Sequence, residues 1–436
     1  MNLNKFFLVM LIVSLFVGPN FVYSQGMGSD TDVFIRKFID LRNSFFIEQK
    51  EKAEKNTMEN GKIVTDSFKD FVIVEYTNFK NKNGYSLYGT VFMPREAYEN
   101  MQKGISRKKY PTITIAYGTM CVNRMYGILY RELAKNGYIV EGLDYQGQGF
   151  SSGPAQKTQD SLLGIRGRVD GEAMADDVLD FRDYLIDNGY PIDVDKMGIW
   201  GWSLGTMVIP AVIAKDPRYK AMSHMGFVYD NAELGSPTHL GKYIDTVKVP
   251  CQIEMAQLAL HDDFPITPWY DAAVRVFDDY NGPIVISIHD PLPYTPISMA
   301  GFMFNKSRTY HYINEDVIPF FDYFVKGEES AYSKIIAPDK YCNDIGKVYR
   351  LGKDVRNFTP EEEKRIQQVI NRRIPIDNGA WFSDYIFLPV WSRIVIPMLP
   401  YTDQIMKSMF KTFLPWNVAW DFAMEYVEPN NEAMNK

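Results

Sequence analysis

The chain has few cysteines, and their spacing offers no metal site. Three occur in 436 residues, Cys121, Cys251 and Cys342, with no Cys-x-x-Cys pair and no Cys/His pair at ligand spacing. Because the number is odd, at least one thiol stays unpaired. We therefore expect a fold that depends neither on disulfides nor on a bound metal.

Long basic runs are also absent. Lys and Arg number 47 against 54 Asp and Glu, which gives a net charge of −7 and a pI near 5.5. A nucleic-acid partner would require a patch of Lys and Arg facing its phosphates. The sequence therefore predicts no nucleic-acid partner and favours a small or uncharged substrate.

The leading apolar run is too short to cross a bilayer as a helix. Residues 6–18 are almost wholly apolar, whereas a helix needs about 20 residues to span a hydrocarbon core of about 30 Å. The run follows Lys5 and precedes the compact residues 22–24, an order typical of a secretory leader. We predict a signal peptide at 1–24 and export to the periplasm or the exterior, with an uncleaved anchor as the alternative.

The body of the chain alternates short apolar runs with helical patterns. Strands are predicted at 112–117, 138–143, 196–200, 220–229, 250–258 and 283–288, and helices at 126–136, 171–188, 206–215, 269–280 and 317–326. Strands without a polar face that alternate with helices indicate parallel βαβ units. The predicted architecture is a doubly wound, mostly parallel sheet, whose ligand sites lie at the carboxyl ends of the strands.

An antiparallel hairpin precedes this region, and two extensions flank the whole. Strands at 71–76 and 86–93 are joined by the turn signal Asn81-Lys82-Asn83-Gly84. We predict a helical N-terminal extension at 25–70, with an amphipathic helix at 32–55, and one α/β domain at 71–330. A helical, aromatic-rich C-terminal extension is predicted at 331–436.

The aromatic stretch at 381–401 of the C-terminal extension is interrupted by Asp384, Arg393 and three prolines. It is therefore not a membrane span. A lid over the site, a docking helix and a peripheral contact with a membrane surface all fit such a segment, and simple packing on the main domain is favoured over these.

The sequence Gly201-Trp202-Ser203-Leu204-Gly205 lies between a predicted strand and a predicted helix. Such a turn projects the central serine from the edge of the sheet, and both glycines are needed because a Cβ would collide with the neighbouring strand and helix. An ordinary strand-to-helix turn would also match the bare pattern. In this context we predict Ser203 as a nucleophile.

A serine nucleophile needs a base that is oriented by an acid, and in this arrangement both follow it along the chain. Asp263, after the strand at 250–258, is the predicted acid in preference to Asp262; two acids capping the next helix are the alternative. His311, just before the final helix, is the predicted base. His289, at the end of the last parallel strand, is its rival.

The oxyanion that forms during acyl transfer needs backbone donors. The Leu204 N–H directly follows the nucleophile, and a second donor is expected after Tyr117-Gly118, from Thr119 or Met120. These groups complete the predicted machinery.

Over about residues 71–329 the chain resembles the α/β-hydrolase superfamily. Within it, the chain looks most like the branch of dienelactone-hydrolase-like and S15/CocE-type acyl hydrolases and peptidases. The similar segments are 83–94, 143–153, the turn around Ser203 and 320–327. The resemblance implies the α/β-hydrolase fold, a Ser-Asp-His triad and no cofactor. Tyr117-Gly118 departs from the usual His-Gly of the oxyanion strand.

These features favour a serine hydrolase that cleaves an ester bond in a small acyl substrate. An exopeptidase of the S15 type using the same triad is the first alternative. The second is a binding protein that keeps the fold without catalysis, which the uncertain identity of the histidine leaves open.

Overall fold

The computed structural model describes the central part of the chain and parts of its flanks. The described residues are 62–65, 69–105, 108–118, 123–146, 151, 171–202, 204–225, 240–256, 279–290, 309–310, 312–335, 339–342 and 346–353. The predicted helices at 32–55 and 269–280 and the aromatic stretch at 381–401 lie outside them.

Within these residues all strands belong to one sheet, in the order β1-β2-β3-β5-β4-β6-β7-β8-β9-β11-β10. The strands are β1 (Lys62–Thr65), β2 (Phe71–Lys80), β3 (Ser86–Pro94), β4 (Tyr110–Ala116), β5 (Ile139–Leu143), β6 (Ile192–Trp202), β7 (Tyr219–Met225), β8 (Cys251–Ala256), β9 (Ile284–Asp290), β10 (Asp339–Cys342) and β11 (Gly346–Lys353). The six strands from β5 to β9 pair in parallel. The strands at both edges pair antiparallel.

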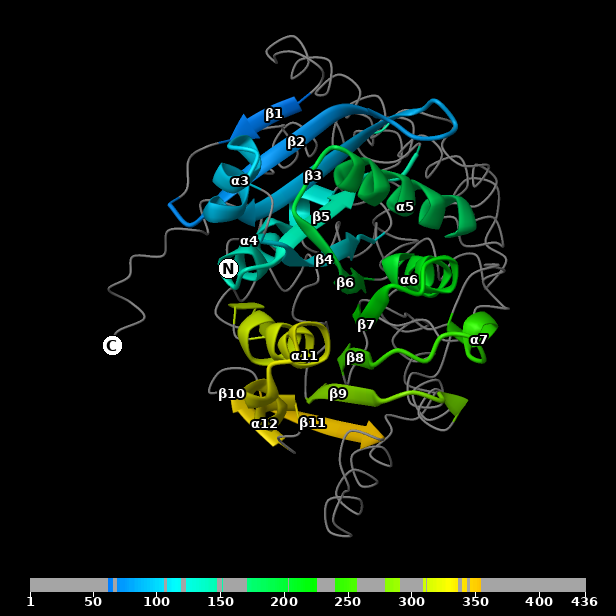
Figure 1. Ribbon diagram of the computed structural model, residues 1–436. Helices are drawn as coiled ribbons and strands as arrows, with labels where there is room; N and C mark the ends of the chain where they lie inside the picture. The colour runs from blue at the N-terminus through cyan, green and yellow to red at the C-terminus, as the bar shows by residue number, and fades with distance from the viewer. Residues whose placement is uncertain are drawn as a thin grey trace, which may run out of the picture.

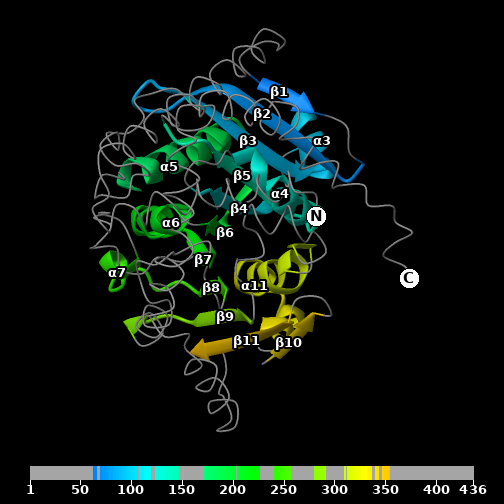
Figure 2. The same ribbon diagram turned by 180° about the vertical axis from the view of Figure 1, so that it is seen from behind.

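Helices cover both faces of the sheet (Figures 1 and 2). One face carries α3 (Arg95–Gln102), α4 (Gly127–Lys135) and the segment of η4 (Ile313–Val317), α11 (Ile318–Phe321) and η5 (Asp322–Lys326), and the other carries α5 (Gly171–Asp187), α6 (Leu204–Lys215) and α7 (Leu240–Tyr243). The remaining short elements are η2 (Asn123–Tyr126), η6 (Glu329–Ala331) and α12 (Tyr332–Ile335). Two helical layers explain why the central strands are apolar on both sides.

The local signals of the sequence predict most of these elements correctly. The hairpin of β2 and β3 turns at Asn81, whose carbonyl accepts the Gly84 N–H at 2.9 Å, and Gly84 has a left-handed φ of 80°. The predicted strands and helices from 112 to 225 match β4 to β7 and the helices between them to within a few residues. Helix α3 has no counterpart among the predicted elements.

The predicted extensions need a correction, because parts of both join the sheet. Residues 62–65 fall in the expected N-terminal helical extension, yet they form β1, paired antiparallel with β2. Residues 339–353 fall in the expected C-terminal helical extension, yet β10 and β11 extend the sheet beyond β9. The reason is that edge strands are short and pair on one side only, so they carry little of the periodicity that reveals a strand.

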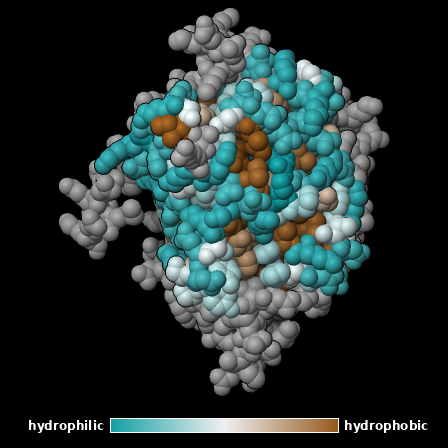
Figure 3. Space-filling view, viewed as in Figure 1, coloured by the Kyte–Doolittle hydropathy of each residue, from teal (hydrophilic) through white to brown (hydrophobic). Residues whose placement is uncertain are grey.

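The core lies between the sheet and its two helical layers, and the described surface is mainly polar. In the view of Figure 3, hydrophilic side chains separate the hydrophobic patches from one another.

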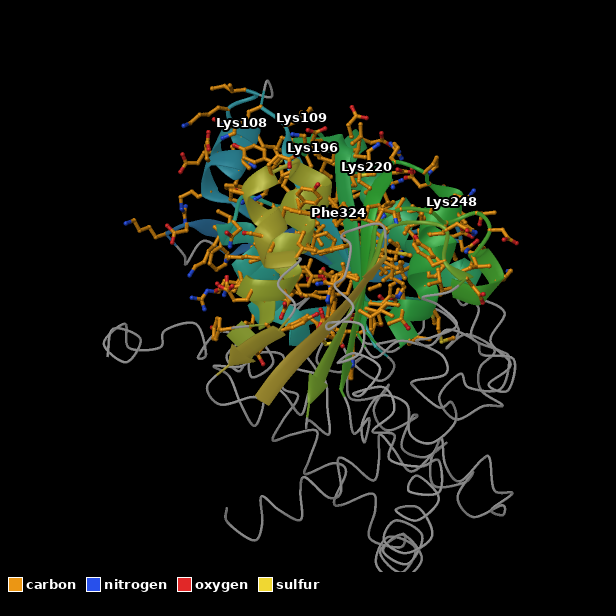
Figure 4. All side chains as sticks on the ribbon, turned by 90° about the horizontal axis from the view of Figure 1, so that it is seen from below. Lys108, Lys109, Lys196, Lys220, Lys248 and Phe324 are labelled. Carbon is orange, nitrogen blue, oxygen red and sulfur yellow. The ribbon has the colours of Figure 1, made fainter. Side chains whose placement is uncertain are left out.

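Exposed lysines lie at or near the amino ends of four neighbouring parallel strands; they are Lys109, Lys196, Lys220 and Lys248 (Figure 4). The opposite end of these strands is where β6 turns into α6.

Candidate functional site

The carboxyl end of β6 meets the start of α6 with a single residue between them. Strand β6 ends at Trp202 and helix α6 begins at Leu204. Ser203, between them, lies outside the described residues. Its two neighbours are buried, with 4% and 5% of their surface exposed. The chain therefore makes the sharp strand-to-helix turn that the sequence predicts at this position.

Both glycines of the turn are required by close packing. A Cβ on Gly201 would stand 2.9 Å from the carbonyl carbon of Gly205 and from the Ile209 side chain. A Cβ on Gly205 would stand 2.0 Å from the carbonyl oxygen of Ala116, at the end of β4. Backbone atoms cannot move aside as a flexible side chain can. The expectation that neither glycine tolerates a side chain is confirmed.

An oxyanion donor is expected in the segment after β4. The structure describes the first two residues of this segment, Tyr117 and Gly118. The Tyr117 ring stacks on that of Tyr145, with centroids 4.6 Å apart, and its hydroxyl accepts the Tyr145 N–H at 3.1 Å. The Gly118 N–H donates to the Tyr126 hydroxyl at 3.3 Å. Thr119 and Met120 lie outside the described residues. The Tyr117 side chain, which replaces the usual histidine, thus links the ends of β4 and β5.

The segment after β5 is held by a buried aspartate. Asp144 is fully buried, and its Oδ1 accepts the Asn123 N–H at 2.7 Å. Its backbone carbonyl accepts a hydrogen bond from the Ser151 hydroxyl. Asp144 and Ser151 lie in the segment at 143–153 that resembles the hydrolase superfamily, and the local sequence pattern predicts no role for either residue.

A second buried carboxylate supports the next turn of the same segment. Asp177 of α5 accepts the Gln146 N–H at 2.9 Å and the Asn81 side-chain amide at 2.7 Å. Burial raises the pKa of Asp177 to about 6, although both hydrogen bonds oppose the rise. This carboxylate therefore joins α5, the β2–β3 turn and the segment after β5, a contact that spans 96 residues and leaves no local trace in the sequence.

The predicted acid and base lie outside the described residues. Asp263 and Asp262 follow β8 but lie outside the described residues, as does His311, which falls between Tyr310 and Tyr312. His289 lies in β9, with its backbone paired to Ala256 of β8 and to Val348 of β11. The backbone of His289 is thus held within the sheet on both sides.

His224 is the histidine that the structure describes most fully. It lies in β7 opposite Gly201 of β6 and is fully buried. Burial lowers the pKa of His224 to about 3, so this imidazole is neutral at physiological pH. Its position before the acid in the chain argues against it as the base.

The described residues contain no set of three or more His, Cys, Asp and Glu side chains arranged to hold a metal ion. None of the helices in this part of the chain is both long enough and apolar enough to cross a bilayer.

Comparison with known proteins supports the class of the fold. A family model described as the prolyl oligopeptidase family matches residues 131–251, from α4 to the start of β8. Dipeptidyl peptidase 8 of Mus musculus and of Homo sapiens are each 26% identical over 231 residues, which is 49% of this chain and 23% of each relative. The chain thus matches about a quarter of the length of these relatives.

The strand order and the family match indicate the same fold. The chain contains a domain with the α/β-hydrolase fold. The matches support the superfamily named by the sequence resemblance, and they point to the prolyl oligopeptidase family without supporting the dienelactone-hydrolase-like and S15 branch. Among solved structures, the chain is similar to an acylaminoacyl peptidase of Pyrococcus horikoshii, with a TM-score of 0.44 and 17% identity over 60% of this chain and 44% of that one.

Proposed function

We propose that this protein hydrolyses acyl bonds with Ser203 as its nucleophile. The observation that carries the proposal is the turn between β6 and α6. There Gly201 and Gly205 pack against backbone with no room for a Cβ, and the one residue between Trp202 and Leu204 is a serine. A tight turn of this kind presents a nucleophile at the carboxyl edge of a doubly wound sheet.

The proposed chemistry follows the roles of a serine triad. The Ser203 Oγ forms a bond to the substrate carbonyl carbon while its proton passes to an imidazole, for which we propose His311, oriented by Asp263. The carbonyl oxygen becomes an oxyanion, stabilised by the N–H groups of Leu204 and Thr119.

The intermediate then collapses and the scissile bond breaks. The leaving alcohol or amine takes the proton from the imidazole. A water molecule next gives a proton to the same imidazole and attacks the acyl carbon, which releases the carboxylic acid and restores the Ser203 hydroxyl. No cofactor takes part in this proposed sequence.

The proposal has two forms, which differ in whether the bond that is cleaved is an ester bond or a peptide bond. The charge balance of the chain favours a small or uncharged substrate, which an ester of a small acyl group would be. The match of residues 131–251 to the prolyl oligopeptidase family favours a peptide bond instead. Incubating the protein with short acyl esters and with aminoacyl amides of the same acyl group distinguishes the two, because the preferred leaving group appears directly as a ratio of kcat/KM values.

The deciding experiment is labelling with a fluorophosphonate probe, which reacts with an activated serine and expels fluoride. The wild-type protein should be labelled, and Ser203→Ala should abolish labelling and lower turnover by several orders of magnitude. Melting curves of both proteins provide the control for folding. A wild-type protein that folds but is neither labelled nor active would overturn the proposal and favour a binding protein on the hydrolase fold.

We further propose that the protein acts after export, in the periplasm or outside the cell. The proposal rests on the charged, apolar and compact sections of residues 1–24. A peripheral contact with a membrane through the aromatic stretch at 381–401 also remains a proposal.

A further inference from the structure

The segment that should supply the second oxyanion donor is anchored at both of its ends. Residues 119–122 are preceded by Gly118 and followed by Asn123, and the N–H groups of these two residues have buried acceptors. The Gly118 N–H donates to the Tyr126 hydroxyl at 3.3 Å, and the Asn123 N–H donates to the Asp144 carboxylate at 2.7 Å. Both anchors involve η2, since Asn123 is its first residue and Tyr126 its last.

Asp144 is itself fixed to the sheet. Its N–H donates to the Tyr88 carbonyl of β3 at 2.8 Å. The Tyr88 N–H donates to the Ser151 hydroxyl at 2.9 Å, and that hydroxyl donates to the Asp144 carbonyl. Hydrogen bonds to its N–H and its carbonyl therefore fix the backbone of Asp144, and its buried carboxylate forms a charge-assisted hydrogen bond with the Asn123 N–H.

The side chain of Asn123 is held by Tyr130, whose hydroxyl lies over a glycine of the sheet. The Tyr130 hydroxyl of α4 donates to the Asn123 Oδ1. Both groups lie over Gly142 of β5, where a Cβ would stand 2.2 Å from the Tyr130 oxygen and 3.0 Å from the Asn123 Oδ1. The absence of a side chain at Gly142 thus allows η2 to approach the sheet closely.

Tyr126 connects this anchored turn with the nucleophile turn. Its ring packs edge-on against Trp200, with centroids 5.6 Å apart, and lies 6.0 Å from the ring of Trp202. Trp202 directly precedes Ser203 in the chain. The buried Tyr126 side chain therefore contacts β6, the strand that leads to Ser203, and accepts the N–H of Gly118, the residue directly before the oxyanion segment.

We propose that Asp144 and Tyr126 are positioning residues that set the location of the oxyanion donor relative to Ser203. This rests on the proposed function above. Neither residue touches the reacting atoms in this scheme. Each acts through a backbone N–H that borders residues 119–122, so removing either acceptor should displace the donor and leave substrate binding almost unchanged. Displacements of about 1 Å in such groups can cost about a hundredfold in rate.

The test compares variants by their rate per active site, with active protein counted by fluorophosphonate titration. Tyr126→Phe keeps the ring against Trp200 and removes the hydroxyl that accepts the Gly118 N–H. Asp144→Ala removes the acceptor of the Asn123 N–H, and Asp144→Asn restores a neutral acceptor of similar shape. We expect Tyr126→Phe and Asp144→Ala to lower kcat by roughly tenfold or more with little change in KM, and Asp144→Asn to recover most of the loss.

Tyr190→Phe is the matched control. The Tyr190 hydroxyl is buried and pairs with the Tyr76 hydroxyl at 2.6 Å, on the side of the sheet where β6 begins. The Tyr190→Phe variant should lose a similar hydrogen bond and show the kcat of the wild type. Melting temperatures of all variants reveal any general loss of structure.

A normal kcat per titrated site in Tyr126→Phe and Asp144→Ala would overturn the proposal, as would a raised KM with kcat unchanged. If Asp144→Ala does not fold, Tyr126→Phe decides alone. A wild-type protein that resists the probe would instead contradict the proposed function, so the two failures are distinguishable.

Discussion

The α-carbon of Gly205 lies against the backbone of Ala116, where a Cβ would stand 2.0 Å from the Ala116 carbonyl oxygen. This contact joins the first turn of α6 to the end of β4. It therefore holds the start of α6, two residues after Ser203, against the last residue of β4.

We predict that Gly205→Ala destabilises the protein by roughly 2 to 4 kcal/mol or prevents folding, because overpacking against backbone cannot be relieved by a rotamer change. Urea unfolding measures the loss. Gly84→Ala is the comparison. A Cβ at Gly84 would meet no atom within 4 Å, so the only penalty comes from placing an alanine at a left-handed φ of 80°. That substitution should destabilise the protein by about 1 kcal/mol. Equal losses in the two variants would show that the contact with Ala116 does not constrain the turn.

The identity of the base can be decided by two substitutions. We predict that His311→Ala lowers kcat about as much as Ser203→Ala, because the members of a triad act as one unit. His289→Ala should retain most activity, since the backbone of His289 is paired with neighbouring strands on both sides. Steady-state kinetics on each purified variant provide the answer. An inactive His289→Ala beside an active His311→Ala would transfer the role to His289.

Glu141 should make stability depend on pH. It is fully buried in β5, its Oε1 accepts a hydrogen bond from the Thr114 hydroxyl, and its Oε2 has no hydrogen-bond partner in the described part of the chain. Burial raises its pKa from 4.5 to about 7, although Thr114 and the charge of Arg182 oppose the rise. Since the folded pKa exceeds the unfolded one, the stabilising contribution is complete below about 4.5 and is lost as the pH rises through 7.

We therefore predict that the free energy of unfolding of the wild type falls between pH 5 and pH 8 by roughly 2 kcal/mol more than that of Glu141→Gln. The glutamine keeps the shape and an acceptor for Thr114 but does not ionise. Urea titrations of both proteins at the two pH values give the difference. Parallel pH profiles would mean that Glu141 does not change its charge in this range.

The leader gives a prediction outside the described residues. We expect the mature protein to begin at Gln25, because residues 1–24 carry the charged, apolar and compact sections of a signal peptide in order. N-terminal sequencing of protein from the exported fraction tests this directly. Protein that begins at Met1 and stays in the cytoplasmic fraction would contradict it.

The central strands and the nucleophile turn could be predicted because their signals are local. Buried parallel strands are short apolar runs, and Gly137 and Gly189 end the predicted helices with left-handed φ values of 86° and 79°. Gly201 and Gly205 flank a serine at the boundary between β6 and α6. In each case the residues that decide the structure lie within a few positions of one another.

The tertiary structure alone decided what depends on distant residues. The pairing of β1 with β2 and of β11 with β9, the joining of α5 to the hairpin turn by Asp177, and the two anchors at Asp144 and Tyr126 each need a partner that the local pattern does not specify. An edge strand or a buried hydrogen bond is set by the register and packing of the whole sheet. The sequence by itself thus determined the order of the elements and the type of the turn, whereas their packing decided which backbone N–H groups were brought to buried acceptors.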